Sequence, residues 1–134
     1  MSGAATATPA VRRVFVCDDQ PDLRRALSEV IQSLPGFEQV GEAGDGERCI
    51  TGLRSTRPDI LILDVNMPQG GAELAGIAKA EVPDLKIVVF SAMRDESTRE
   101  AMYGAGVDDY VVKTGRLRPL RDALHRVAGL PAAG

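Results

Sequence analysis

Four short apolar segments of the chain each end on a residue that can bind a phosphoryl group or a cation. The residues that follow them are the pair Asp18 and Asp19 after residues 14–17, Asp64 after residues 60–63, Ser91 after residues 87–90 and Lys113 after residues 110–112. In parallel α/β sheets the ligand site lies beyond the carboxyl ends of the strands. If the segments are parallel strands, three carboxylates, a hydroxyl and an ammonium meet in one shallow cleft. This set of groups indicates a magnesium-dependent site for a phosphoryl group.

The adjacent acids Asp18 and Asp19 point in opposite directions if the strand stays regular. Both reach one cation only where the strand has ended, and Gln20-Pro21 is suited to end it. Mg²⁺ keeps several of its waters, so one or two direct carboxylates are enough to hold it. The alternative interpretation is an acidic cluster that complements the dipole of the following helix.

Asp64 favours the metal interpretation, because a carboxylate at the end of an all-apolar strand is costly to bury without a cation or hydrogen bonds. It can act as a metal ligand and also as a nucleophile that becomes an aspartyl phosphate. Lys113 supplies a mobile point charge for phosphate oxygens, and Ser91 supplies a hydroxyl donor. Taken singly, Ser91 is typical of a strand-end turn and Lys113 of a solvated edge; together they favour phosphoryl chemistry.

Five predicted strands alternate with five predicted helices. The strands cover residues 12–17, 37–43, 60–63, 85–90 and 107–112. The first helix runs from Pro21 to Leu34, and the second from an Asp45 cap to Arg57. The third passes through Leu74 and ends before Pro83. The fourth begins at Asp95 or Ser97 and ends at Gly104 or Gly106, and the fifth covers residues 116–128. Right-handed crossovers then require a parallel sheet with helices on both faces. The weak alternation of residues 37–43 predicts an edge strand.

The composition is that of one soluble globular domain: 134 residues, 44% hydrophobic and 26% charged. The net charge of −3 gives no reason to expect binding to nucleic acid or to a membrane surface. No apolar stretch approaches the roughly 20 residues that span a bilayer. We expect a mobile tail at 1–10, the domain at 11–129 and a C-terminal tail at 130–134.

The two cysteines, Cys17 and Cys49, are too few for a disulfide framework or a metal site. Both fall on apolar faces of predicted elements, which predicts small core residues with free thiols. A reducing, cytoplasmic setting fits that interpretation.

At these residues the chain resembles the CheY-like receiver domains of bacterial two-component response regulators. The match runs from Val11 to Ala128 and includes Asp18-Asp19, Asp64 with Met67-Pro68, Ser91-Ala92 and Lys113 in the family's order and spacing. The resemblance implies a flavodoxin-like (βα)5 doubly wound fold with a five-stranded parallel sheet of order 2-1-3-4-5. Thr114 in place of a proline, and the loop Gln69-Gly70-Gly71, are similar to receivers of LuxR/NarL-type regulators.

The resemblance also implies roles for the site residues. Asp64 would accept a phosphoryl group from a sensor histidine kinase or a histidine phosphotransfer protein. Asp19, Asp64 and the backbone carbonyl of Asn66 would bind Mg²⁺ directly, while Asp18 would act through water. Lys113 and the Ser91 hydroxyl would hold the phosphoryl oxygens.

In the family, a hydroxyl and an aromatic ring form a two-residue switch, and Ser91 and Tyr110 occupy those positions. Their movement shifts the surface formed by the fourth helix, fifth strand and fifth helix, which binds a downstream protein or a second copy of the chain. Asn66 and Met93 lie where the family tunes dephosphorylation.

Three functions compete. The first is a receiver that signals through a protein partner; the second is the receiver portion of a LuxR-type DNA-binding regulator. The third is a Mg²⁺-dependent aspartyl-phosphate phosphatase, which usually carries a second aspartate two residues after its nucleophile. Asn66 takes that place and cannot transfer protons in that way, so we expect a signalling domain and not an enzyme. The only histidine, His125, is expected to be a solvated or helix-end residue.

Overall fold

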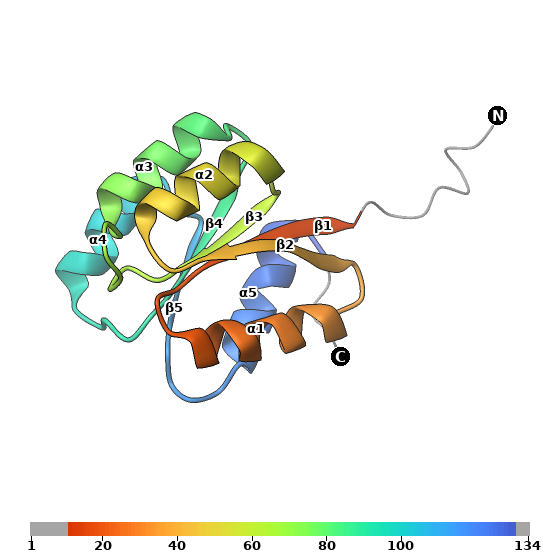
Figure 1. Cartoon of the computed structure of the whole chain (residues 1–134). Helices are drawn as coiled ribbons and strands as arrows, with labels where there is room; N and C mark the ends of the chain where they lie inside the picture. Colours follow the sequence, from red (N-terminus) through yellow and green to blue (C-terminus); the bar gives the residue numbers. More distant parts are fainter. Residues whose placement is uncertain (1–10, 131–134) are drawn as a thin grey trace.

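Five strands pair in parallel in the order β2-β1-β3-β4-β5, with helices on both faces of the sheet (Figure 1). The computed structural model describes residues 11–130. The strands are β1 Arg12–Cys17, β2 Phe37–Ala43, β3 Ile60–Leu63, β4 Lys86–Ser91 and β5 Asp109–Val112. The helices are α1 Pro21–Ser33, α2 Gly46–Thr56, α3 Ala72–Glu81, α4 Glu96–Gly104 and α5 Arg118–Ala128. The predicted element order, the strand order and the edge position of β2 are confirmed.

Element ends differ from the sequence-based expectation by one or two residues. The strand β5 begins at Asp109 and not at Val107, because the N–H of Val107 still bonds to the carbonyl of Met102 in the turn that closes α4. The helix α5 begins at Arg118, which leaves Pro119 in its first turn, where a missing N–H costs nothing.

Alternate residues of each strand enter two separate cores. One core packs α1 and α5 against residues such as Val16, Ile62 and Phe90. The other packs α2, α3 and α4 against residues such as Phe15, Leu63 and Val89. In Figure 1, α1 and α5 lie below the sheet, α2 and α3 lie above it, and α4 lies at its left. This period of two is what a sheet covered on both faces requires.

Two glycines allow α2 to approach the sheet closely. A Cβ atom at Gly41 of β2 would lie 2.7 Å from the ring of Phe15, and one at Gly52 of α2 would lie 2.3 Å from it. The Phe15 ring therefore fills a space that only glycine leaves open on both sides.

Aspartates cap two helices. The carboxylate of Asp45 accepts a hydrogen bond from the Arg48 N–H at 2.8 Å, as predicted. Of the two candidate caps for α4, the structure uses Asp95, which accepts from the Thr98 N–H at 3.0 Å and from the hydroxyls of Ser97 and Thr98. These hydrogen bonds lower the pKa of Asp95 to about 2, and the largest effect is that of the Thr98 hydroxyl.

The expectation of two free thiols is wrong for this structure, which joins Cys17 and Cys49 as a disulfide. Both side chains are buried, as expected. The helix α2 lies over the end of β1 with the two Cα atoms 6.2 Å apart, so the thiols meet. The sequence places each cysteine on an apolar face but does not give the position of α2 along β1.

Of the two alternatives given for His125, the helix-end position is confirmed and the solvated one is wrong. His125 lies in the last turn of α5, as expected, but it is buried and not solvated: its Nδ1 lies 2.8 Å from the Arg121 carbonyl oxygen, and its ring packs edge-on against Phe37. Leu130, assigned to the C-terminal tail, packs against the α1–α5 core. Residues 1–10 and 131–134 of the predicted tails lie outside the described residues.

Candidate functional site

The carboxyl ends of the central strands bring the three predicted acids together. Asp18 and Asp19 follow β1, and Asp64 follows β3. One carboxylate oxygen from each lies within 4.8 Å of the other two. The convergence expected from the sequence is therefore present at this rim of the sheet.

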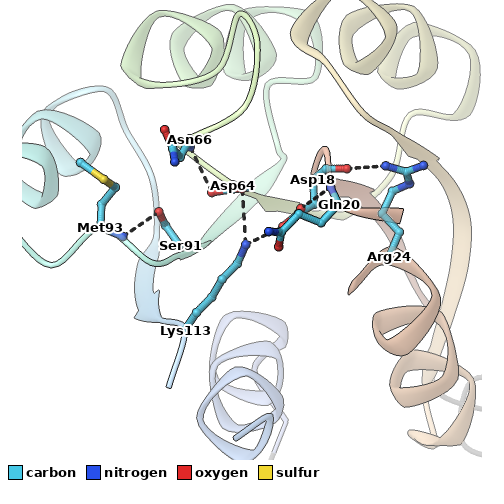
Figure 2. A network of polar contacts seen from close by, with 8 residues as sticks. All are labelled: Asp18, Gln20, Arg24, Asp64, Asn66, Ser91, Met93 and Lys113. Carbon is cyan, nitrogen blue, oxygen red and sulfur yellow. Dashed lines mark hydrogen bonds and ion pairs between the residues drawn. The ribbon is translucent and has the colours of Figure 1, made fainter. Parts of the chain in front are cut away.

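Lys113 reaches this acidic cluster from the end of β5. Its Nζ atom lies 2.8 Å from Oδ2 of Asp18 and 3.4 Å from Oδ2 of Asp64 (Figure 2). The backbone fixes the base of the side chain, because the Lys113 N–H donates to the Ser91 carbonyl at 2.8 Å. The ammonium thus partly neutralises two carboxylates that are almost fully buried, at 1% and 4% exposure.

Each buried carboxylate is also held by the backbone just after it. Oδ1 of Asp18 accepts from the Gln20 N–H at 2.9 Å, and Oδ1 of Asp64 accepts from the Asn66 N–H at 3.0 Å. These are Asx turns, in which the side chain replaces a backbone acceptor two residues back. They end both strands at the rim, which explains how the adjacent Asp18 and Asp19 contribute to one cluster.

A hollow of about 230 Å³ opens at this rim. Its lining residues are Asp19, Gln20, Asp64, Asn66, Ala92 and Lys113. Asp19 is exposed, whereas Asp18 lies beneath the surface with its oxygens already bonded. A larger hollow of about 390 Å³ lies between α2 and α3 and contains none of the predicted site residues.

Ser91 and Tyr110 lie in a neighbouring polar cluster. The Ser91 side chain is fully buried, is not among the residues that line the rim hollow, and accepts a hydrogen bond from the Met93 N–H at 3.2 Å. The Tyr110 hydroxyl donates to the Met93 carbonyl at 2.8 Å, and its ring is buried against the α2–α3–α4 core. Burial raises the pKa of the Tyr110 phenol. The backbone of Met93 therefore links the two residues, while the Met93 side chain is exposed.

Sequence reasoning missed two residues at the site. Gln20 lines the hollow and supplies an amide to Asp18, and Arg24 donates through Nη1 to the Asp18 carbonyl at 2.7 Å. The available signal was the position of Arg24 one turn into the helix that begins right after the acidic pair.

The fold and the acidic rim define a doubly wound α/β domain of the receiver class. Residues 14–125 match the response regulator receiver domain. The chain therefore belongs to the receiver domains of response regulators.

Several relatives are similar over most of the chain. The nitrate/nitrite response regulator protein NarL of Escherichia coli is 34% identical over 116 residues, which cover 86% of this chain and 54% of NarL. The chemotaxis protein CheY of Thermotoga maritima is 31% identical over 119 residues, which cover 87% of this chain and 98% of CheY. The chain spans about half the length of the first of these.

A crystal structure of a LuxR-family two-component response regulator from Aurantimonas sp. SI85-9A1 superposes with a TM-score of 0.81 and 25% identity, covering 92% of this chain and 90% of that one. None of the helices within residues 11–130 is long and apolar enough to cross a bilayer.

Proposed function

We propose that Asp64 accepts a phosphoryl group from a phosphohistidine of a sensor histidine kinase or a histidine phosphotransfer protein. The observation that carries the proposal is the position of Lys113, whose ammonium lies between two buried carboxylates beside the open hollow. In the transfer, an Asp64 carboxylate oxygen bonds to phosphorus while the bond from phosphorus to the histidine nitrogen breaks. The electron pair of that bond stays on the nitrogen.

The acidic cluster fits Mg²⁺, because its three carboxylates offer closely spaced oxygen ligands. Asp19, Asp64 and the backbone carbonyl of Asn66 would hold the ion directly. Asp18 would act through water, because Gln20 and Lys113 already occupy its oxygens. When bound, Mg²⁺ neutralises charge on the phosphoryl oxygens.

The side chains around Asp64 then position the phosphoryl group. Lys113 supplies a cation, and the hydroxyl of Ser91 can turn its hydrogen toward a phosphoryl oxygen. Because Ser91 and Tyr110 both bond to the backbone of Met93, a movement of Ser91 alters the support of the Tyr110 ring. We propose that these two residues switch the α4–β5–α5 surface and that Asn66 and Met93 tune the dephosphorylation rate.

The test is labelling with acetyl phosphate and Mg²⁺, measured as a mobility shift on a phosphate-affinity gel. Asp64→Asn should abolish labelling, because the amide cannot form an acyl phosphate. Asp84→Asn is the matched control, since Asp84 is exposed and precedes β4, at the rim formed by the amino ends of the strands. Full labelling of Asp64→Asn would contradict the proposal.

The output is a protein partner or a second copy of the chain bound at α4–β5–α5. A second candidate, the receiver portion of a LuxR-type DNA-binding regulator, is favoured by the coverage of only 54% of NarL. The coverage of 98% of CheY favours the first candidate. The reading frame beyond Gly134 distinguishes them. The proposed setting is the cytoplasm. Free thiols at Cys17 and Cys49 in purified protein would support it, whereas a disulfide would argue against it, because disulfides are rare in that compartment.

A further inference from the structure

The turn that carries Asp18 and Asp19 is held from outside the acidic cluster. The Asp18 N–H still donates to the carbonyl of Ala43, the last residue of β2, at 3.0 Å. The carbonyl of Asp18, by contrast, accepts from Nη1 of Arg24 at 2.7 Å. The guanidinium of α1 thus provides a donor for the Asp18 carbonyl just beyond the end of β1, at the peptide that joins the two acids.

Arg24 is itself fixed by a second contact. Its Nε donates to Oε2 of Glu42 at 3.0 Å, and its side chain is only 22% exposed (Figure 2 draws Arg24 beside Asp18). The guanidinium passes beside Gly44, where a Cβ atom would lie 3.3 Å from Nη1. Two donors in a planar fork therefore bridge β2 and the acidic turn, a geometry that a single ammonium does not reproduce.

The charge of this bridge is balanced, because the cation of Arg24 pairs with the anion of Glu42. Its effect on the rim is therefore one of position more than of net charge. The peptide between Asp18 and Asp19 determines where the exposed Asp19 carboxylate points relative to Asp64. Without the bridge, this peptide loses its only described hydrogen bond to a residue of α1, and the acidic turn is held only by the contacts of the Asp18 N–H and side chain.

We propose that Arg24, held by Glu42, is a positioning residue for the cation site: it orients the Asp18–Asp19 peptide so that both carboxylates face Asp64. This inference rests on the proposed Mg²⁺-dependent function and adds to it the residues that hold the site in place.

The test is the affinity of the whole chain for Mg²⁺, measured by isothermal titration calorimetry. Arg24→Met with Glu42→Gln removes the bridge without changing the net charge and should raise the Kd about tenfold, as loss of an outer partner does for other metal ligands. Acetyl phosphate labelling should slow at low Mg²⁺ and recover at saturating Mg²⁺.

The matched control is Arg25→Met with Asp22→Asn. This neighbouring pair on α1 is 3.6 Å apart, highly exposed and removed with the same balance of charge. Its Kd for Mg²⁺ should equal that of the wild type. If the variant with Arg24→Met and Glu42→Gln does not fold, the single change Arg24→Lys serves instead. It keeps the cation and should still weaken Mg²⁺ binding.

The outcomes separate this inference from the proposed function. A bridge variant that melts at a lower temperature but binds Mg²⁺ with the wild-type Kd makes the contact a purely structural link and overturns the inference alone. If Arg24→Lys binds Mg²⁺ with the wild-type Kd, the two donors of a planar guanidinium are not required, and that part of the inference is overturned. Absence of Mg²⁺ binding in the wild type overturns both the inference and the proposed function.

Discussion

The ammonium of Lys113 lies 2.8 Å from Oδ2 of Asp18, closer than its distance of 3.4 Å to Oδ2 of Asp64. In this structure, therefore, the lysine compensates mainly the most deeply buried acid of the rim. Movement of this ammonium toward a phosphoryl group on Asp64 would weaken its pairing with Asp18, and a cation at the rim would replace part of that compensation.

Lys113→Ala should destabilise the chain by about 3 kcal/mol, because it leaves Asp18 buried without its cation. Added Mg²⁺ should restore more stability to this variant than to the wild type, as measured by urea unfolding with and without the ion. Acetyl phosphate should still label the variant, whereas the response of the α4–β5–α5 surface should be impaired. Lys86→Ala, which removes a half-exposed lysine 3.9 Å from Asp108, is the control. Equal stability of Lys113→Ala and wild type would contradict the role given to the pair.

Tyr110→Phe should lose about 1 kcal/mol of stability at pH 8, because it removes the hydrogen bond to the Met93 carbonyl. Burial raises the pKa of the phenol, so the folded state retains the proton to higher pH than the unfolded state. This contribution is fully present below about pH 10, the ordinary pKa of tyrosine, and is lost as the pH rises through the folded value. The difference in Tm between wild type and variant should therefore shrink above pH 10; a constant difference would contradict the burial of the phenol.

Gly46→Ala should destabilise the chain by about 2 kcal/mol, because a Cβ atom there would lie 2.3 Å from the carbonyl oxygen of Gln69 in the loop after Asp64. The change should also slow labelling, since this loop carries Asn66. Gly76→Ala in α3 is the matched comparison: no described atom lies within 4 Å of its added Cβ, and the residue is exposed in a helix. It should stabilise the chain by about 0.5–1 kcal/mol. Urea unfolding measures both variants, and a stabilising Gly46→Ala would refute the close contact.

The pairing of Cys17 with Cys49 predicts that protein purified and unfolded without reductant has no titratable thiol, and that reductant releases two. Because the bond closes a loop across a separation of 32 residues, reduction should lower stability by about 3 kcal/mol. Cys49→Ala should show no further loss on reduction. Two titratable thiols before reduction would instead support the free cysteines expected from the sequence.

The parts of the site that the sequence predicted are those that strand ends determine. Asp18, Asp19, Asp64 and Lys113 each follow an apolar run, and parallel pairing alone brings such positions to one rim. Ser91 also follows such a run, yet its hydroxyl bonds to Met93, because the direction of a side chain depends on the turn after the strand.

Contacts between a helix and the end of a strand were not predictable in the same way. Arg24 and Cys49 reach the end of β1 through the rotation and axial position of α1 and α2 on the sheet. Hydrophobic periodicity fixes which face of a helix is buried but not how far the helix has slid along its strand. The missed contact of Arg24 and the misread pairing of Cys49 therefore have the same cause.

Alternate residues along the strands give the molecule two separate cores, and Tyr110 belongs to one of them. Its ring packs in the same layer as Met102 of α4, whereas Leu120 and Leu124 of α5 lie on the far side of the sheet. A movement of the aromatic ring would therefore reach α4 within its own core, whereas it would reach α5 through β5, the strand that carries Tyr110 and also contributes Val111 to the other core. A spectroscopic label on the outer surface of α1, which packs in the other core, should accordingly change less than a label on α4 when acetyl phosphate and Mg²⁺ are added.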